Sequence, residues 1–352
     1  MTVVTEPTGP TATRIQLKGL NMAELESWSL KQGEPAYRGR QIFEWLYGQG
    51  VSDPAKMDNL PRALRKRLAG EADLTAASIL TRTVSPSGAT VKYLLELAGG
   101  GRVETVSMVQ GRRHTLCVSS QVGCNVGCDF CATARMGLLR NLTAGEIVDQ
   151  YLLAQADRRL AVTNVVFMGM GEPLLNYRQV LQAADIFHHP KAMQLGAGRI
   201  TISTAGVVPK IEQFVAEERP YRLAISLNAS TDASREQIMP INATWPLAAL
   251  LKAARAYANR PRRTITFEYV LLAGLNDTPD DAARLVAMLK GLACKVNVIP
   301  YNDIGGIYRR PKRPAIDRFV AALRKGDFPV LVRWSHGSDM AAGCGQLVAE
   351  AA

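Results

Sequence analysis

The stretch Cys117-Val-Ser-Ser-Gln-Val-Gly-Cys124-Asn-Val-Gly-Cys128-Asp-Phe-Cys131 carries the most specific pattern in the chain. Its last three cysteines have a C-x3-C-x2-C spacing, and Cys117 stands seven residues before them. A segment this short cannot gather three thiols as a regular helix or strand, but it can do so by wrapping around a metal centre. Glycines within the segment allow the backbone to make such a turn. The stretch therefore predicts a metal centre held by Cys124, Cys128 and Cys131.

The number of cysteines favours an iron–sulfur cluster over zinc. A structural zinc site takes four protein ligands, often from two C-x2-C knuckles, but the chain has no matching second knuckle and only four histidines. Cysteine thiolates are the usual ligands of iron–sulfur clusters, and three of them on a four-iron cluster leave one iron open to a small molecule. The spacing resembles the radical S-adenosylmethionine (SAM) superfamily, in which that iron chelates SAM. A zinc knuckle and three incidental cysteines are the alternatives.

The composition is that of a globular protein. With 352 residues, 47% of them hydrophobic, the chain can build one large domain and a small one. It has no run of 18 or more apolar residues, so we expect no membrane association. Residues 1–13 are small and polar and lack the layout of a secretion signal, so we expect a disordered lead. The clustered cysteines suit a reducing compartment, and we expect a cytoplasmic protein.

The formal net charge of +11 indicates a polyanionic partner such as nucleic acid, although a merely basic surface is the alternative. Residues 14–75 are predicted to be helical, because apolar residues recur at helical spacing. Basic residues crowd these helices, and they predict either a phosphate-binding surface or a solvated face. They are Arg38, Arg40, Arg62, Arg65, Lys66 and Arg67. We therefore expect residues 14–75 to form a helical accessory domain that binds nucleic acid.

The rest of the chain shows two sequence patterns, one over residues 76–115 and another over 116–352. Short β-prone runs separated by Gly and Pro turns indicate a β extension over 76–115. After the cysteines, strand-like and helix-like runs alternate, which is typical of parallel β/α units. The predicted strands are 162–168, 199–203, 221–227, 264–272, 295–299 and 329–333, and helices begin near 143, 177, 208, 247, 279 and 315. This pattern predicts an α/β fold whose main domain is a partial (β/α)6 barrel with its active site at the C-terminal ends of the strands.

Polar residues follow these predicted strands where a barrel collects its active site. Gly171 allows a ligand to approach the backbone closely, and Glu172 can accept a hydrogen bond from an ammonium group. Further strand ends carry Ser203, Ser226, Leu227, Asn228 and Asn297. Each residue alone can simply satisfy backbone groups. Their recurrence on successive strands predicts a site for the amine, carboxylate, ribose and adenine of SAM.

Three residues outside these motifs are candidates for covalent and proton-transfer chemistry. Cys344 lies between glycines after the last strand, so we expect a reactive thiol near the barrel mouth, with a buried inert thiol as the alternative. Cys117 can face the cysteine loop, whereas Cys294 is expected to be inert. Glu104 stands in an otherwise apolar strand, where a surface position and a general base are the two interpretations.

Several motifs in combination resemble the RlmN/Cfr family of radical SAM RNA methyltransferases, and within it the RlmN branch. The resemblance runs from about residue 17 to the end and includes the helix after Leu60-Pro61. Its motifs are 115–124, the three-cysteine core, 169–176 (GMGEPLLN), 203–209 (STAGVVP), 295–300 (KVNVIP) and 344–347 (CGQL). The chain departs from the family at Gly343, where alanine is usual, at His336, where arginine is common, and at Asn228, where histidine is frequent. None of these changes removes a group that the chemistry needs.

The resemblance implies methylation of carbon 2 of an adenosine in 23S rRNA, and of the adenosine beside the anticodon in tRNA. Carbon 2 of adenine is electron-poor and is not a nucleophile, which is a chemical reason for radical chemistry with a cofactor. The implied route uses a [4Fe-4S] cluster and two SAM per turnover. One SAM methylates Cys344, and cleavage of the second activates the S-methyl carbon, which adds to adenine. Glu104 is the candidate base for the ring hydrogen, and Cys117 releases the RNA by forming a disulfide with Cys344.

The resemblance also implies partners. These are 23S rRNA, tRNA and a flavodoxin-type electron donor, and we expect the chain to be a monomer. Three other interpretations stay open at this point. They are methylation of carbon 8 by a Cfr-type enzyme, a radical SAM enzyme with a non-RNA substrate, and an RNA-binding protein with a structural metal.

Overall fold

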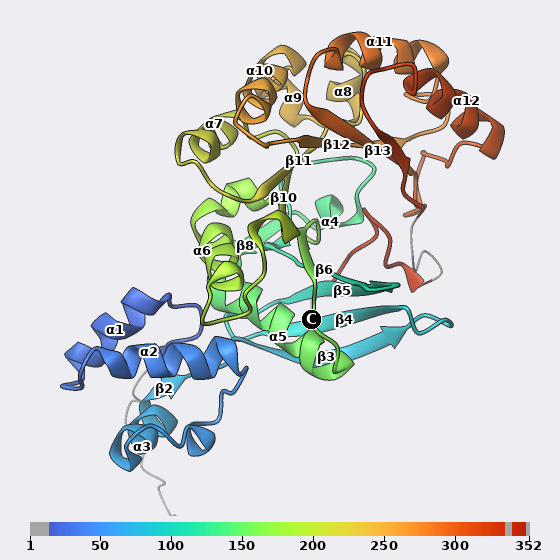
Figure 1. Cartoon of the computed structure of the whole chain (residues 1–352). Coiled ribbons are helices and arrows are strands. Elements are labelled where there is room, and N and C mark those ends of the chain that lie inside the picture. The colour runs from blue at the N-terminus through green and yellow to red at the C-terminus, as the bar shows by residue number, and fades with distance from the viewer. Residues whose placement is uncertain (1–13, 335–339, 350–352) are drawn as a thin grey trace, which may run out of the picture.

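The computed structural model describes residues 14–334 and 340–349, so the lead expected over 1–13 lies outside the described residues. A small helical part comes first in the chain (Figure 1). It comprises β1 (Ile15–Gln16), α1 (Met22–Lys31), α2 (Tyr37–Phe43), a π-helical turn (Glu44–Gly48), a 3-10 turn (Pro54–Lys56), α3 (Arg62–Glu71) and β2 (Ala72–Asp73). Helix α1 begins at a capping box, in which Asn21 and Glu24 bind each other's backbone amides. Strands β1 and β2 pair in parallel, which brings the two ends of this part together.

The main sheet contains ten strands in the order β14-β13-β12-β11-β10-β9-β6-β5-β4-β3. Strands β3 to β6 are antiparallel neighbours, whereas β6 and β9 to β14 run parallel. The strands are β3 (Ala77–Val84), β4 (Thr90–Leu97), β5 (Arg102–Gln110), β6 (Arg113–Cys117), β9 (Asn164–Phe167), β10 (Ile200–Thr204), β11 (Arg222–Ser226), β12 (Ile265–Leu271), β13 (Cys294–Pro300) and β14 (Val330–Val332). Because β14 and β3 are the two edges, the parallel strands form an open barrel, as predicted. Strand β6 joins this barrel to the antiparallel extension in one continuous sheet.

Helices follow the parallel strands and cover the outer face of the barrel (Figure 1). They are α5 (Ala144–Arg158), α6 (Tyr177–His188), α7 (Val208–Ala216), α10 (Leu247–Ala258), α11 (Pro279–Leu289) and α12 (Arg313–Leu323). Strand residues such as Phe167, Ile202 and Phe267 are fully buried, and burial of each such side chain contributes about 1.5–3 kcal/mol. Since side chains alternate along a strand, the residues between them face the barrel interior. In the described part of the chain, every helix is too short or too polar to span a bilayer.

The segments around the cysteine loop contain elements that the sequence patterns do not predict. Strands β7 (Gln121–Gly123) and β8 (Leu138–Asn141) pair on either side of the loop, with α4 (Ala132–Arg135) between them. Helices α8 (Asp232–Ile238) and α9 (Ile241–Thr244) follow β11. Gly123 has a φ of +77°, and a Cβ there would lie 1.8 Å from the Gly137 carbonyl oxygen. Glycine is therefore required where β7 enters the loop.

The N-terminal part is anchored to the barrel through α5. Lys18 and Asp149 form an ion pair with an Nζ–Oδ1 distance of 3.1 Å, and both side chains are buried. Beside this pair, a Cβ on Gly19 would lie 2.3 Å from the backbone nitrogen of Gly145. Loss of one partner from a buried ion pair typically costs about 3–5 kcal/mol. This close backbone contact and the ion pair fix the N-terminal part against the barrel.

Candidate active site

Cys124, Cys128 and Cys131 lie on the loop between β7 and α4, and their side chains are partly exposed. The loop rests on the end of α8, where the Asp129 amide donates to the Ile238 carbonyl over 3.0 Å. Burial raises the pKa of Cys124 to about 11, and the charge of the Cys131 thiol adds to that shift. The predicted ligands are therefore together on one loop, within electrostatic reach of each other.

This set of donors fits a four-iron cluster. Within residues 14–334 and 340–349, no group of three His, Cys, Asp or Glu side chains surrounds a position for one metal ion. A cluster does not need that arrangement, because each thiolate binds a different iron atom. The loop thus offers three cluster ligands and leaves the fourth iron to a small molecule.

Ser226, Glu268 and Asn297 form a row across three neighbouring strands. Ser226 of β11 lies opposite Glu268 of β12, which lies opposite Asn297 of β13. Asn297 donates from Nδ2 to Glu268 Oε1 over 2.8 Å, and its Oδ1 is buried without a partner among the described residues. An unsatisfied buried acceptor costs about 1–3 kcal/mol, unless a bound molecule donates to it. A polar molecule such as SAM therefore fits the interior of the barrel. Ser203 of β10 is opposite Ala224, one level lower on the same face.

Glu172 connects the ends of two barrel strands. Its Oε1 accepts from the Leu174 amide over 3.0 Å, and its Oε2 accepts from the Ala205 amide over 2.7 Å. Burial raises the pKa of this carboxyl group, and the Ala205 hydrogen bond opposes the shift. A carboxylate has about four lone-pair positions, so Glu172 can still accept from an ammonium group. At the preceding Gly171, φ is +98° and a Cβ would lie 2.5 Å from the Gln121 side chain.

Asn228 is engaged within the protein. It adopts a φ of +59°, its Oδ1 accepts from the Val270 amide over 2.9 Å, and its Nδ2 lies 3.3 Å from the sulfur of Met239. The amide side chain therefore holds the turn after β11, and a bound cofactor would meet the backbone there. The adjacent Leu227 is buried, and its carbonyl accepts from Nε of Arg235 over 3.0 Å.

The segment that carries Cys344 rests directly on the cysteine loop. The Ala132 amide donates to the Gly345 carbonyl over 2.7 Å, and Asn302 donates to the Cys344 carbonyl over 3.1 Å. The Cys344 side chain is exposed, as predicted for a thiol at the barrel mouth. Desolvation by the surrounding protein raises the pKa of the thiol to about 12, and the charges of Cys131 and Cys117 add to the shift. The structure thus brings the candidate methyl carrier to the cluster ligands.

Cys117 is the last residue of β6 and lies opposite Val106 of β5 and Val166 of β9. It is buried, and burial raises the pKa of its thiol to about 12. The disulfide expected between Cys117 and Cys344 is not formed in the structure, in which all six cysteines are free. Cys294 is buried at the start of β13, as expected for a thiol without a chemical role.

Glu104 is buried in β5, so the surface interpretation of this residue is wrong. Its Oε1 pairs with Lys92 Nζ over 2.8 Å, and its Oε2 accepts from the Val348 amide over 2.9 Å. Because Glu104 lies two residues before Val106, it shares the sheet face of Cys117. The Glu104 carboxylate lies on the sheet face of Cys117 and is bonded to the segment that follows Cys344, so it is available as a base there.

Three residues of this site escape the sequence analysis. They are Lys92 of β4, Glu268 of β12 and Arg235 of α8. Lys92 and Glu268 give the same signal as Glu104, a charged residue inside an apolar strand. Arg235 gives no signal, because an arginine in a short helix is ordinarily exposed. The predicted residue His336 lies outside the described residues.

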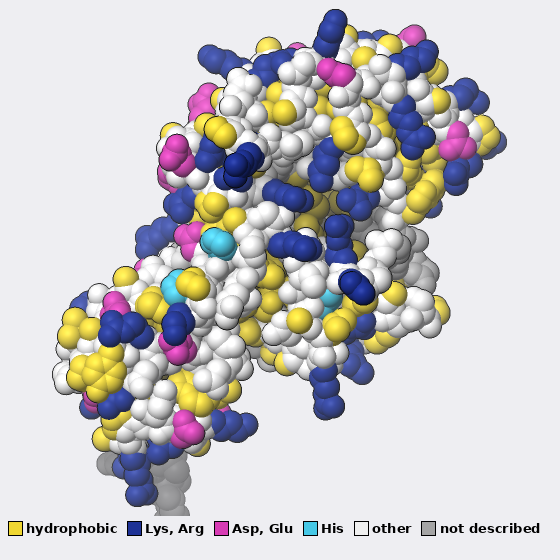
Figure 2. Space-filling view, in the orientation of Figure 1, with side chains coloured by type: hydrophobic (Ala, Val, Ile, Leu, Met, Phe, Trp, Pro, Cys, Tyr) yellow, Lys and Arg dark blue, Asp and Glu magenta, His cyan; other side chains and the backbone are white. Residues whose placement is uncertain are grey.

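Four of the six basic residues predicted to bind phosphate make hydrogen bonds within the N-terminal part. Arg38, Arg40, Arg65 and Arg67 donate to Asn59, Glu26, Ala55 and Gln32 within the same part. Arg62 and Lys66 are exposed and make no side-chain hydrogen bond to the described residues. Figure 2 shows further Lys and Arg side chains over this face of the molecule, including the rim of a hollow between the barrel and the antiparallel strands.

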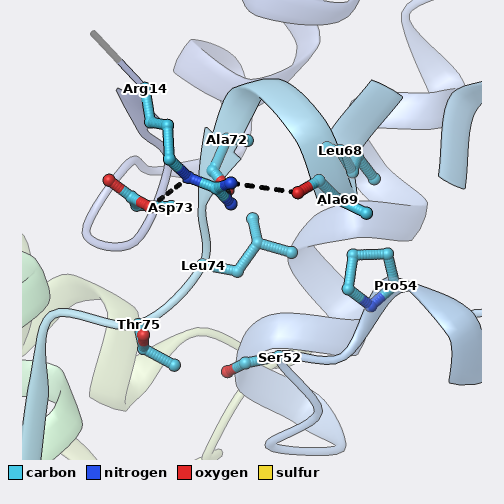
Figure 3. Close-up of a pocket in the computed structure, with 9 residues that line it drawn as sticks. All are labelled: Arg14, Ser52, Pro54, Leu68, Ala69, Ala72, Asp73, Leu74 and Thr75. Atoms are coloured by element: carbon cyan, nitrogen blue, oxygen red, sulfur yellow. Dashed lines mark hydrogen bonds and ion pairs between the residues drawn. The ribbon is translucent and has the colours of Figure 1, made fainter. Parts of the chain in front are cut away.

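A cavity of about 230 Å³ lies in the N-terminal part, and none of its lining residues belongs to the site described above (Figure 3). Arg14 lines this cavity, but its guanidinium is held by the Asp73 carboxylate over 2.6 Å and by the Ala69 carbonyl over 3.0 Å. These bonds fasten the first described residue to the end of α3. The charged group that lines this cavity is therefore engaged in holding the N-terminal part together.

The partial barrel and the three-cysteine loop define a radical SAM enzyme, and residues 118–286 match the family model described as the radical SAM superfamily. Residues 15–74 match the model described as the ribosomal RNA large subunit methyltransferase N-terminal domain. The chain belongs to the RlmN family.

Its relatives resemble it over nearly the whole chain. The dual-specificity RNA methyltransferase RlmN of Geobacter sulfurreducens is 47% identical, covering 95% of this chain and 92% of the relative. The probable dual-specificity RNA methyltransferase RlmN of Moorella thermoacetica is 45% identical over 95% of this chain and 97% of its own. The crystal structure of a radical SAM methyltransferase from Sphaerobacter thermophilus has a TM-score of 0.92 at 43% identity, covering 96% of this chain and 100% of that one.

Proposed function

We propose that this chain is a SAM-dependent RNA methyltransferase that methylates carbon 2 of an adenosine in 23S rRNA and in tRNA. The observation that carries the proposal is the docking of Cys344 beside the cluster ligands, with Cys117 and Glu104 on the adjoining sheet face. A radical SAM enzyme that only cleaves SAM does not need two further thiols at its site. The names of the relatives support RNA as the substrate class.

Cofactor binding follows from the arrangement of the barrel mouth. Cys124, Cys128 and Cys131 would hold a [4Fe-4S] cluster. When bound, the cluster supplies the electron that cleaves SAM and starts the radical chemistry. Residues at the strand ends would bind SAM, of which each turnover uses two molecules. These residues are Gly171, Glu172, Ser203, Ser226, Leu227, Asn228 and Asn297.

Cys344 is the methyl carrier in this proposal. Its exposed side chain can meet both SAM at the barrel mouth and an adenine that enters from solvent. As a thioether it holds the methyl carbon at the site where the ring is attacked, and the RNA is then covalently attached through this carbon. Hydrogen bonds to the carbonyls of Cys344 and Gly345 keep the carrier in position during these steps.

Glu104 and Cys117 complete the reaction. The Glu104 carboxylate takes the proton from the ring carbon, and the unpaired electron left on the ring must also leave, for which the oxidised cluster, when bound, would be the acceptor. The Cys117 sulfur then attacks the Cys344 sulfur, so that an S–S bond forms and the bond from Cys344 to the methylene carbon breaks. The electron pair of the broken bond stays with the carbon, which takes up a proton and becomes the methyl group. An external flavodoxin-type donor returns two electrons to the disulfide.

The remaining parts of the chain have roles in RNA binding and support. Residues 14–75 would act as an accessory domain that contacts phosphates, 76–115 as the β extension that carries Glu104, and 116–352 as the barrel domain. One chain contains all the groups named above, so a monomer suffices.

The proposal is tested by incubating the protein with SAM, a reductant and either 23S rRNA or tRNA without oxygen, and then analysing digested nucleosides by chromatography and mass spectrometry. We expect 2-methyladenosine from both RNAs, and none from Cys344→Ala. Appearance of 8-methyladenosine instead would assign a Cfr-type reaction. Cleavage of SAM without any methylated adenosine would contradict RNA methylation.

A further inference from the structure

Arg235 of α8 is a fully buried arginine whose hydrogen-bond acceptors are all neutral. Its Nε donates to the Leu227 carbonyl over 3.0 Å, and its Nη2 donates to the carbonyls of Ala205 and Ser226 over 2.6 and 3.2 Å. Its Nη1 donates to Asn242 Oδ1 over 3.1 Å. The side chain therefore ties the ends of β10 and β11 together, but none of these partners compensates its charge.

The carboxylate that acts on this guanidinium from nearby is the exposed Asp232. Asp232 binds other groups, since its Oδ1 accepts from Asn242 Nδ2 over 3.0 Å and from the Leu247 amide over 2.8 Å. Arg235 takes part in none of the ion pairs formed by the described residues. Burying a charge without an opposite charge costs several kcal/mol. The structure thus calls for an anion near Arg235.

The cysteine loop is the neighbour that can supply this anion. The residues just after Arg235 carry the loop, because the Asp129 amide binds the Ile238 carbonyl and Cys128 packs beside the apolar cluster that contains Ile238 and Met239. Burial lowers the pKa of Arg235 to about 10, and a charge on Cys128 acts against this shift. The Met239 amide also donates to the Arg235 carbonyl over 2.7 Å, so Arg235 lies one helical turn from the residues on which Cys128 packs.

We propose that Arg235 is the buried countercharge of the iron–sulfur cluster and raises its reduction potential. A four-iron cluster on three thiolates is already negative, and one added electron makes it more so. A cation in the weakly screening interior stabilises the more negative state, and the charge around a cluster is one of the factors that set its potential. Because Arg235 also holds the carbonyls of Ala205 and Ser226, the same side chain connects the cluster to the strand ends that bind SAM. This inference rests on the cluster of the proposed function.

The test is a redox titration of the anaerobically reconstituted full chain without SAM, followed by electron paramagnetic resonance of the reduced cluster. At the wild-type midpoint, Arg235→Gln should lower the ratio of reduced to oxidised cluster at least tenfold, which is about 59 mV for one electron. Arg235→Lys keeps the charge and should stay within about twofold. Arg263→Gln is the control. Arg263 also donates to a backbone carbonyl, that of Pro220, but Pro220 precedes β11 and so lies at the end of the strand opposite to Ser226.

Either of two results would overturn the proposal. An unchanged ratio in Arg235→Gln would show that the charge does not act on the cluster. Equal shifts in Arg235→Gln and Arg235→Lys would assign the effect to lost hydrogen bonds. A wild-type protein that binds no iron would contradict both the cluster and this inference, whereas a normal cluster with an unshifted potential contradicts this inference alone.

A second variant tests the charge with Arg235 in place, in case its replacements do not fold. The double substitution Asp232→Asn and Asn242→Asp exchanges the two side chains, so their mutual hydrogen bond can persist and the net charge of the chain is unchanged. It moves a carboxylate to about 3.1 Å from the guanidinium, where it neutralises the local charge. The ratio of reduced to oxidised cluster should again fall, and an unchanged ratio would overturn the proposal.

Discussion

Glu104 accepts a hydrogen bond at Oε2 from the backbone amide of Val348 over 2.9 Å, although 244 positions separate the two residues in the sequence. The other carboxylate oxygen binds Lys92, whose Nζ lies 3.4 Å from the Ala341 carbonyl. Strands β4 and β5 therefore hold the Cys344 segment on both sides of the thiol. These contacts hold the candidate base against the segment that carries the candidate methyl carrier.

Replacement of Glu104 by Gln separates its role as a hydrogen-bond acceptor for the Cys344 segment from its role as a base. Glutamine can still accept from the Val348 amide, but it cannot take a proton. We expect Cys344 to be methylated normally, because that step needs no base at the adenine, while methyl transfer to RNA falls about 100-fold or more. Peptide mass spectrometry of Cys344 and nucleoside analysis of the RNA measure the two steps separately.

Two further variants serve as controls for Glu104→Gln. Lys92→Met leaves the carboxylate in place and should slow transfer less than Glu104→Gln does. Glu96→Gln removes the partner of Arg102 in an ion pair of 3.8 Å on the same two strands, and transfer should be unaffected. Normal transfer by Glu104→Gln would exclude Glu104 as the base.

Removal of any one of Cys124, Cys128 and Cys131 should remove the cluster. Each Ala variant loses one of the three thiolates that fit a four-iron cluster, so the anaerobically reconstituted protein should bind little iron and lose its broad visible absorption. Cys294→Ala is the control, since Cys294 is buried at the start of β13, and it should bind iron normally. Stoichiometric zinc without iron in the wild type would contradict the cluster.

Charge reversal of Arg62 and Lys66 should weaken RNA binding. Both residues lie exposed on α3, and each phosphate contact that is lost reduces counterion release. We expect affinity to fall by about tenfold or more, and the slope of log affinity against log salt to fall by about 1 to 2. Filter binding over a series of salt concentrations measures both. Charge reversal of Arg318, on α12, and Arg324, just after it, is the control, because it changes the net charge equally at another place. Equal losses of RNA affinity in both variants would mean that only the net charge matters.

His114 should make the fold sensitive to acid. It is buried in β6, where Nδ1 donates to the Ala161 carbonyl over 3.2 Å and Nε2 accepts from Ser107 over 2.8 Å. Burial lowers the pKa of His114 below its usual 6.5. Below pH 6.5 the unfolded chain therefore binds a proton that the folded chain does not. As the pH is lowered through this range, the free energy of unfolding decreases by up to about 1.4 kcal/mol per pH unit. Urea unfolding from pH 7.5 to 5 should show a smaller loss in His114→Gln, and parallel profiles would contradict this expectation.

The periodic elements of the barrel are predictable from the sequence, because strands such as 264–272 and helices such as 177–187 are long enough to show their period. The cysteine ligands and the strand-end residues are also predictable, since their spacing reflects local chemistry. The short paired strands β7 and β8 and the helix α8 are not, because none of them spans enough residues to establish a period.

The parts of the site that cannot be predicted depend on pairings between segments that are distant in the sequence. The bond from Glu104 to Val348 and the row Ser226–Glu268–Asn297 depend on strand register, which the order of residues does not display. Arg235 would be expected at the surface, because a buried arginine is stable only with partners that come together in the fold.

The central claim is that Cys344 carries the methyl carbon and Cys117 releases the product. Cys117→Ala should still be methylated at Cys344 and should still attack adenine, but the thioether bond to the RNA then has no thiol to break it. The measurement is a denaturing gel of Cys117→Ala after turnover, with and without ribonuclease, and with Cys344→Ala alongside. We predict a shifted, ribonuclease-sensitive protein band in Cys117→Ala that is absent from Cys344→Ala. Free, fully methylated RNA and no shifted band would contradict the claim.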